Sequence, residues 1–128
     1  MRSLLIIVLF YLPTAVAAQF TYTFDQSIPV KNMDGDALAM PWAGGINAAQ
    51  YNTIDLNGDG KQDLVLFDRM ANKVLTYLNI DDRYQYAPEY EDLFPDGVTN
   101  WILLRDYNCD GKKDIFTGDI LGIKVYTN

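Results

Sequence analysis

One acidic nine-residue segment occurs twice in this chain, and the repeat restricts the folds that the sequence can adopt. Residues 55–63 read DLNGDGKQD, and residues 106–114 read DYNCDGKKD at an offset of 51 residues. The similarity extends into the apolar residues that follow and, after a connection two residues shorter, into the segments 77–79 and 126–128. A fixed internal period of this length is typical of architectures that repeat one supersecondary unit.

Short runs of strand-forming residues surround both acidic segments. Each segment is preceded by one such run and followed by two: 50–54, 64–68 and 74–78 in the first copy, and 101–105, 115–119 and 123–126 in the second. Runs of four to eight residues bounded by Gly, Asp and Asn predict strands. We therefore expect the order strand, acidic loop, strand, turn, strand, twice. The aromatic and acidic segment 81–94 is expected to supply an outer strand and the connection between the two copies.

The spacing of oxygen-bearing side chains within each loop suits a hard cation. Calcium prefers six to eight oxygen ligands, and a tight loop can direct alternate side chains and one main-chain carbonyl toward it. Carboxylates held close together repel one another unless a cation is present. We therefore expect about two structural calcium ions. Their expected ligands are Asp55, Asn57, Asp59, the Lys61 carbonyl and Asp63 in the first loop, and Asp106, Asn108, Asp110, the Lys112 carbonyl and Asp114 in the second.

The loops are not EF-hands. An EF-hand needs Glu at position 12 and helices on both sides, whereas position 12 here is Leu66 or Thr117 and the following runs predict strands. Hairpin turns rich in Asp, Asn and Gly that bind no metal are the alternative. The segment 32–36 lacks a ninth-position carboxylate, since Leu38 falls near that place, and we expect an ordinary turn there.

The pattern D-x-N-x-D-G-x-x-D followed by an apolar strand resembles the FG-GAP repeat, also called VCBS-like, of integrin-alpha-type β-propellers. The resemblance covers about residues 49–128. It implies one four-stranded blade per repeat, with the calcium loop between the first two strands and the ligand positions given above. Cys109 occupies the position that Gly58 has in the first loop, and this position provides no ligand in the family pattern. The expected fold is all-β, a partial β-propeller of about one and a half to two four-stranded blades.

The first 18 residues have the pattern of a signal peptide. Arg2 precedes an unbroken apolar run at 4–12, Pro13 ends the run, and Ala15, Ala17 and Ala18 provide a cleavage site. The run is about half the length that spans a bilayer, so no membrane insertion is expected after cleavage. A buried strand or helix is the alternative. The expected location is extracellular or at the cell surface.

Four regions follow from these features: 1–18 as signal peptide, 19–48 as a lead-in segment, 49–98 as the first repeat and 99–128 as a truncated second repeat. Propellers close with about four to eight blades. We therefore expect further blades and a longer secreted protein. A self-contained or multimerising two-repeat domain is the alternative.

Composition excludes several function classes. The net charge of −7 argues against nucleic-acid binding, and the absence of His removes Ser-His-Asp and Cys-His catalysis. The single Cys109 cannot form an intrachain disulfide. Glu89 and Glu91 could suggest a glycosidase pair, but solvated charges explain them better.

The sequence predicts a non-catalytic calcium-binding module that mediates adhesion or binds an extracellular protein or glycan. The alternative is an accessory region of a larger secreted hydrolase or lyase whose catalytic part lies beyond this chain.

Overall fold

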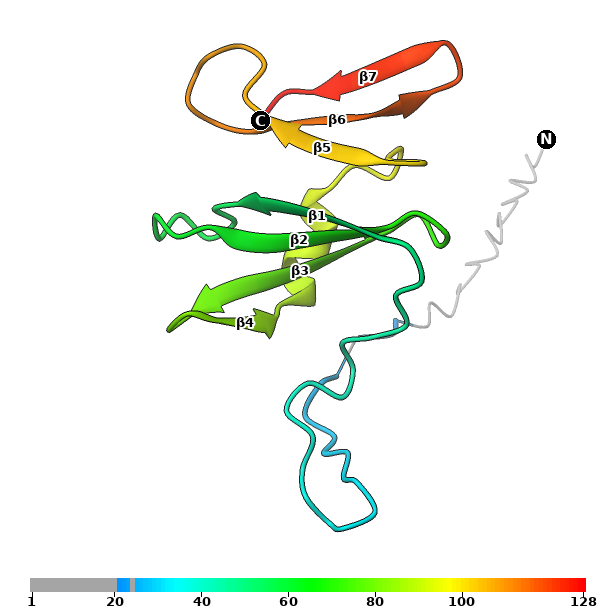
Figure 1. Cartoon of the computed structure of the whole chain (residues 1–128), viewed down its shortest axis with the longest axis vertical. Coiled ribbons are helices and arrows are strands. Elements are labelled where there is room, and N and C mark those ends of the chain that lie inside the picture. The colour runs from blue at the N-terminus through cyan, green and yellow to red at the C-terminus, as the bar shows by residue number, and fades with distance from the viewer. Residues whose placement is uncertain (1–20, 24) are drawn as a thin grey trace, which may run out of the picture.

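The computed structural model describes residues 21–23 and 25–128, so the predicted signal peptide lies outside the described residues (Figure 1). Two antiparallel sheets form the folded part. The first sheet has the order β1-β2-β3-β4 and the second has the order β5-β6-β7. The strands are β1 (Ala49–Ile54), β2 (Asp63–Asp68), β3 (Lys73–Ile80), β4 (Arg83–Tyr86), β5 (Ile102–Arg105), β6 (Asp114–Asp119) and β7 (Gly122–Tyr126). The all-β prediction is confirmed, with four strands in one sheet and three in the other.

The strand register repeats together with the sequence. In the first sheet Tyr51 lies opposite Leu66. Their equivalents in the second copy, Ile102 and Thr117, lie opposite each other in the second sheet. Both acidic loops connect the first two strands of their sheets. The two copies thus fold into the same strand, loop, strand, turn, strand unit.

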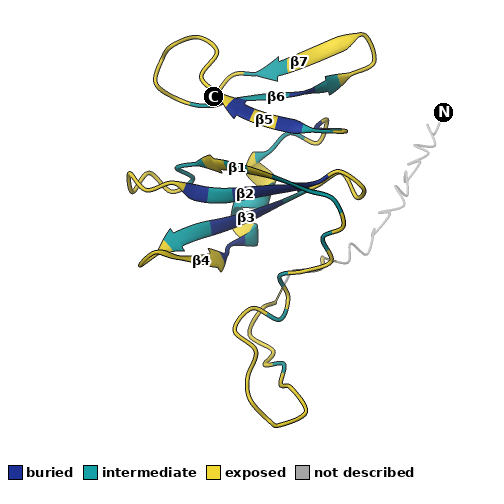
Figure 2. Ribbon diagram, in the orientation of Figure 1, coloured by how far each residue is buried: buried dark blue, intermediate teal, exposed yellow. Residues whose placement is uncertain are grey.

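The main core lies between the two sheets. Side chains alternate between the faces of a strand, so Val65 and Phe67 of β2 point toward the second sheet while Ile102 and Leu104 of β5 point back toward them. These four residues are buried in one cluster with Val98 (Figure 2). Burial of side chains of this size contributes about 1.5–3 kcal/mol each. The contact between the sheets is therefore the main apolar interface of the fold.

A second cluster lies on the opposite face of the first sheet. It contains Leu66, Leu75, Tyr77 and Tyr86, and the Tyr77 and Tyr86 rings are 5.3 Å apart. Ala43 and Ile46 of the lead-in segment pack against it. The rest of the described lead-in forms an isolated bridge between Lys31 and Ala37 and joins neither sheet. At its tip the Asn32 side chain accepts hydrogen bonds from the N–H groups of Asp34 and Asp36, as expected for a turn.

The segment 81–94 provides β4 and the 3₁₀ helix η1 (Pro88–Leu93), and so confirms the prediction of an outer strand and a connection. Glu91 lies on η1 and is half-buried, so the expectation of a solvated edge charge is wrong for this residue. The Tyr86 hydroxyl donates a hydrogen bond of 2.9 Å to Glu91 Oε1. Burial raises the pKa of the Glu91 carboxyl.

No helix among the described residues is long and apolar enough to cross a membrane.

Candidate metal sites

The first acidic loop is folded around the carboxylate of Asp55. Its Oδ1 accepts the Gly58 N–H at 2.7 Å, and its Oδ2 accepts the Gly60 N–H at 2.8 Å. Both glycines have positive φ, 78° and 82°, a region in which side chains with a Cβ are disfavoured. The loop therefore closes because the first position draws the backbone around itself and the glycines permit the required turn.

The third and fifth positions continue the same arrangement. Asn57 Oδ1 accepts the Asp59 N–H at 3.0 Å, and Asp59 Oδ1 accepts the Lys61 N–H at 2.8 Å. Asn57 Nδ2 also donates to Asp59 Oδ2 at 3.2 Å. The hydrogen bond from the Lys61 N–H lowers the pKa of the Asp59 carboxyl. Asp59 is thus ionised at neutral pH and lies beside the amide oxygen of Asn57.

The second loop repeats these contacts at equivalent residues. Its first-position carboxylate accepts two backbone N–H groups, its third-position amide accepts one, and its fifth-position carboxylate accepts one. The acceptor and donor pairs are Asp106 with Cys109 (2.6 Å) and Gly111 (2.9 Å), Asn108 with Asp110 (3.1 Å), and Asp110 with Lys112 (2.8 Å). The backbone bond from Lys112 lowers the pKa of the Asp110 carboxyl. Cys109 adopts φ of 63°, close to the value of Gly58.

The ninth position has a structural role that spacing did not predict. Asp63 is the first residue of β2 and has no exposed surface. Its Oδ2 accepts the Leu56 N–H at 2.8 Å, and its Oδ1 accepts the Asn79 N–H at 2.8 Å. The carboxylate therefore ties the start of the loop to the end of β3.

Asp114 does the same in the second sheet. It is also fully buried. It accepts the Tyr107 N–H at 2.7 Å and the Asn128 N–H at 2.9 Å.

The predicted ligands thus divide into two groups in each loop. The residues at positions 1, 3, 5 and 7 lie within the loop itself. The residue at position 9 is buried at the start of the following strand. The described residues contain no group of three or more His, Cys, Asp or Glu side chains that could hold a metal ion. The candidate donor set therefore consists of two carboxylates, one amide oxygen and one main-chain carbonyl near the tip of each loop. Carboxylate oxygens have two acceptor directions each, so their backbone hydrogen bonds leave acceptor capacity for a hard cation.

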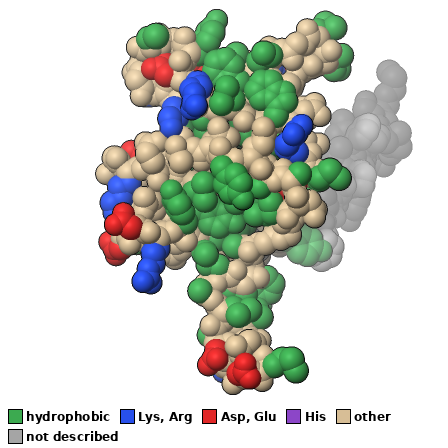
Figure 3. Space-filling model, viewed as in Figure 1, with side chains coloured by type: hydrophobic (Ala, Val, Ile, Leu, Met, Phe, Trp, Pro, Cys, Tyr) green, Lys and Arg blue, Asp and Glu red, His purple; other side chains and the backbone are tan. Residues whose placement is uncertain are grey.

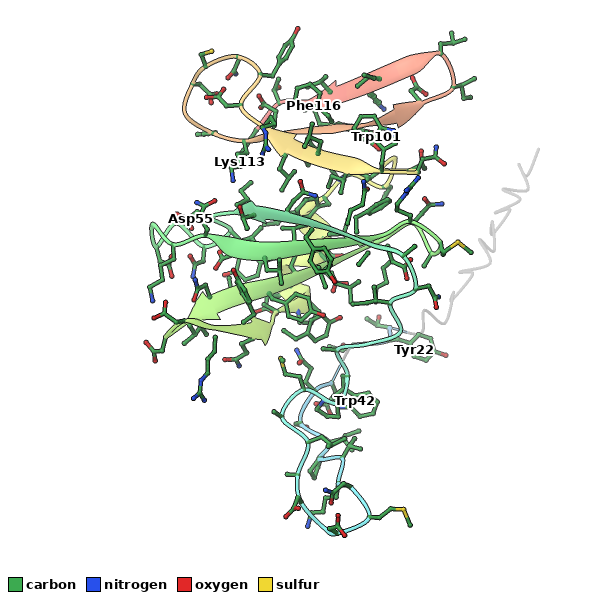
Figure 4. All side chains as sticks on the ribbon, in the orientation of Figure 1. Tyr22, Trp42, Asp55, Trp101, Lys113 and Phe116 are labelled. Atoms are coloured by element: carbon green, nitrogen blue, oxygen red, sulfur yellow. The ribbon has the colours of Figure 1, made fainter. Side chains whose placement is uncertain are left out.

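Lys113, at position 8 of the second loop, joins the two copies, and sequence reasoning did not single it out. Its Nζ donates to the Thr53 carbonyl oxygen, to Thr53 Oγ1 at 3.3 Å and to Gln62 Oε1 at 2.9 Å. Figure 4 shows Lys113 reaching from the second sheet toward the first. Burial lowers the pKa of its ammonium group. The only sequence signal is that Lys113 replaces Gln62, its equivalent in the first loop.

Two amide side chains of β1 bind the backbone of β5. Ile102 N–H donates to Gln50 Oε1 at 3.1 Å, and Leu104 N–H donates to Asn52 Oδ1 at 3.2 Å. Asn52 Nδ2 in turn donates to the Ile102 carbonyl at 3.4 Å. The inner strands of the two sheets are therefore joined by side chain to backbone hydrogen bonds beside the apolar core.

Residues 55–117 match the family model described as FG-GAP-like repeat. This region belongs to the FG-GAP-like repeat family. The matched range begins at the first residue of the first acidic loop, contains the whole second loop and ends in β6. No curated protein and no solved structure matches the chain.

FG-GAP-like repeats are generally non-catalytic structural modules, and the match identifies no catalytic family. They typically occur in extracellular or surface proteins, and the match suggests a repeat module of a larger protein.

Proposed function

We propose that this chain is a secreted or cell-surface calcium-binding FG-GAP-like module, which has no catalysis of its own and mediates adhesion or ligand binding. The observation that carries the proposal is the repetition of one loop structure. Both loops present an ionisable carboxylate, an amide oxygen and a second carboxylate at alternate positions, and both use the same backbone hydrogen bonds. Ordinary turns have no need to preserve this donor set twice.

The residues that would hold the ion in the first loop are Asp55, Asn57, Asp59 and the Lys61 carbonyl, and the buried Asp63 carboxylate would anchor the base of the loop. In the second loop Asp106, Asn108, Asp110 and the Lys112 carbonyl would hold the ion, and Asp114 would anchor the base. Bound calcium would supply positive charge between carboxylates that otherwise repel one another. The ion would stabilise the loop at the edge of each sheet, and a chain outside the cell meets enough calcium for a weak site to fill.

Calorimetric titration of calcium into the full chain tests this proposal, paired with thermal melting in calcium and in chelator. We expect about two ions per chain, dissociation constants near 10⁻⁴–10⁻³ M and a melting temperature that rises with calcium. The double variant Asp59→Asn and Asp110→Asn should lose most of the heat. A control with the same charge change, Asp81→Asn and Asp82→Asn in the exposed β3–β4 turn, should keep it. No heat and an unchanged melting temperature in the parent would contradict calcium binding.

Export has its own test. Expression of the whole sequence in a secreting host should deliver protein to the medium with Gln19 as its first residue, because the small residues before it form the cleavage site. N-terminal sequencing of the recovered protein measures this directly. Protein that remains in the cell with residues 1–18 attached would contradict the secreted location.

The ligand of the module is proposed by class only, as an extracellular protein or glycan. A hollow of about 440 Å³ between the sheets supports a ligand-binding role, since it combines apolar Ile54, Phe94 and Ile115 with the charged Asp55 and Lys113. A glycan array and a panel of extracellular matrix proteins would test the proposal. Lys113→Met should reduce any binding that uses this hollow, whereas Arg83→Met, on β4, should not.

A further inference from the structure

The first acidic loop contains the one asparagine of the sequence that is followed by glycine. Asn57 is at the third position of the loop, and Gly58 is at the fourth. An asparagine side chain can react with its own main chain, because the backbone nitrogen of the next residue can reach the Cγ atom. Glycine favours this attack, since it has no Cβ to hinder the approach. The pair is therefore a candidate site of covalent modification.

The pair is open to solvent. Both residues are exposed on the connection between β1 and β2. In Figure 3 charged side chains gather at the left edge of the view, where this connection lies in Figure 1. A Cβ added at Gly58 would meet nothing within 4 Å, so the space beside this residue is open. Water can therefore reach the reacting atoms, and a small leaving group can depart.

The hydrogen bonds of the loop hold the groups that such a reaction needs. The Gly58 N–H donates to Asp55 Oδ1 at 2.7 Å, so a carboxylate lies beside the proton that the attacking nitrogen must lose. Asn57 Oδ1 accepts the Asp59 N–H at 3.0 Å, so a backbone donor lies where negative charge develops during attack on Cγ. The loop thus provides a nucleophile, a proton acceptor and a donor for the developing oxyanion.

The second loop is a natural control for this reaction. Asn108 Oδ1 accepts the Asp110 N–H at 3.1 Å. The next N–H, of Cys109, donates to Asp106 Oδ1 at 2.6 Å. Both asparagines are exposed, and Gly58 and Cys109 share a positive φ, 78° and 63°. The two sites therefore have the same contacts and differ in the Cβ that Cys109 carries beside the attacking nitrogen.

We infer that the folded first loop converts its own Asn57 to aspartate and isoaspartate. The Gly58 nitrogen loses its proton and bonds to Cγ of Asn57, the Cγ–Nδ2 bond breaks, and Nδ2 takes up a proton and leaves as ammonia. The product is a cyclic imide. Water then opens the ring, at Cγ to give aspartate or at the main-chain carbonyl to give isoaspartate. The sequence of steps consumes water alone, and nothing is oxidised or reduced.

The conversion changes the donor set of the first loop alone. It adds a negative charge beside Asp55 and Asp59, and in isoaspartate it also lengthens the main chain within the loop. Its consequence for calcium rests on the proposed function. Aspartate at the third position would replace an amide oxygen by a carboxylate, whereas isoaspartate would move the oxygen out of the alternate pattern. The conversion itself does not require calcium.

Peptide mapping by mass spectrometry tests the inference on the full chain, kept folded in chelator at neutral pH. Trypsin cleaves after Lys61 and after Lys112, so Asn57 and Asn108 fall in different peptides. Asn57 should gain the mass difference between NH₂ and OH several-fold faster than Asn108, as two products that chromatography separates. Isomerisation of Asp–Gly pairs leaves the mass unchanged and is not counted. No conversion of Asn57, or equal rates at the two sites, would overturn the inference.

Reciprocal exchange of the following residue separates its effect from that of the surrounding loop. Gly58→Cys should slow the conversion of Asn57 several-fold, and Cys109→Gly should accelerate that of Asn108 several-fold. Cys109→Gly removes a Cβ from a residue at positive φ, so this variant keeps the folded state that circular dichroism verifies. If Asn108 reacts no faster in Cys109→Gly than in the parent, the following residue does not control the reaction and the inference fails.

A comparison with the chain in urea tests the role of the folded loop. A reaction that occurs only in the unfolded state would be slower in the folded chain by the unfolded fraction, about 10³-fold or more. We expect a smaller difference, because the folded loop holds both the Gly58 nitrogen and Asn57 Oδ1 by hydrogen bonds. A difference of that size or larger would overturn the role of the folded loop. Failure to bind calcium would contradict the proposed function and would leave these rates in chelator unchanged.

Discussion

The buried carboxylate of Asp63 gives the sharpest test of how the acidic loops are held. Asparagine at this position has nearly the same volume, but it presents one acceptor and one donor where the aspartate presents two acceptors. The Leu56 and Asn79 N–H groups both donate to Asp63 at 2.8 Å. Asp63→Asn therefore keeps one of these hydrogen bonds, weakened by the loss of charge, and leaves the other N–H facing an NH₂ group in a buried site.

The expected loss of stability follows from these two changes. A hydrogen bond to a charged group contributes about 1.5–3 kcal/mol, and an unsatisfied buried donor costs about 1–3 kcal/mol. Removing the buried charge offsets part of this loss. We expect Asp63→Asn to lower the free energy of unfolding by about 2–4 kcal/mol, a large share of the about 5–15 kcal/mol of a typical domain.

Urea unfolding of the full chain in chelator measures this loss without a contribution from metal. Asp34→Asn, which makes the same change on an exposed loop, is the control and should stay within about 0.5 kcal/mol of the parent. If Asp63→Asn also stays within that range in chelator, the ninth carboxylate does not hold the loop to β3. A larger loss in calcium than in chelator would add a ligand role to the structural one.

Three further predictions follow from single contacts. Cys109→Gly should raise the free energy of unfolding by about 1 kcal/mol in a urea titration, because Cys109 holds φ of 63° where the first loop has glycine; a loss of stability would contradict this. The pKa of Glu91 is raised in the folded state, so its ionised form destabilises the fold above that pKa and the penalty disappears as pH falls through it. Glu91→Gln keeps an acceptor for Tyr86 and should flatten the dependence of the melting temperature on pH above the ordinary pKa of glutamate; an unchanged pH profile would contradict the assignment. Lys113→Met should lower the free energy of unfolding by about 1–3 kcal/mol, since Thr53 and Gln62 lose their shared donor; Lys112→Met, in the exposed part of the same loop, should have little effect.

Much of the local structure could be predicted from the sequence because it depends on neighbouring residues. The acidic loop begins at Asp55 and turns at Gly58 and Gly60, and all three lie within six residues. The strands follow from short apolar runs bounded by these loops. The outer strand and the connection in 81–94 could also be predicted, because Tyr84 and Tyr86 alternate in a short run that Pro88 interrupts.

The contacts that cross the fold could not be predicted in this way. Spacing assigned Asp63 to a ligand position, but its buried hydrogen bonds depend on the register of β3, whose Asn79 is 16 residues away. Lys113 reaches Thr53, 60 residues earlier in the chain, and only the packing of the two sheets brings them together. Glu91 lies beside Tyr86 because η1 turns back toward β3 after β4, whereas a local reading of its charge predicts exposure.

The differences between the two copies are concentrated in the strands. The strand register and the loop residues at positions 1, 3, 5, 6, 7 and 9 are the same in both, because each acidic loop must close around its own first aspartate. On the face of the first sheet that contacts the second sheet, and on the equivalent face of the second sheet, Gln50 becomes Trp101 and Phe67 becomes Gly118. The indole of Trp101 lies against Gly118, so an aromatic ring is present on this face of both sheets although a different strand supplies it. The exchange of Phe67 for Gly118 and of Gln50 for Trp101 therefore keeps one aromatic ring on this face of each sheet, while the amides of Gln50 and Asn52 are replaced by the apolar side chains of Trp101 and Leu103.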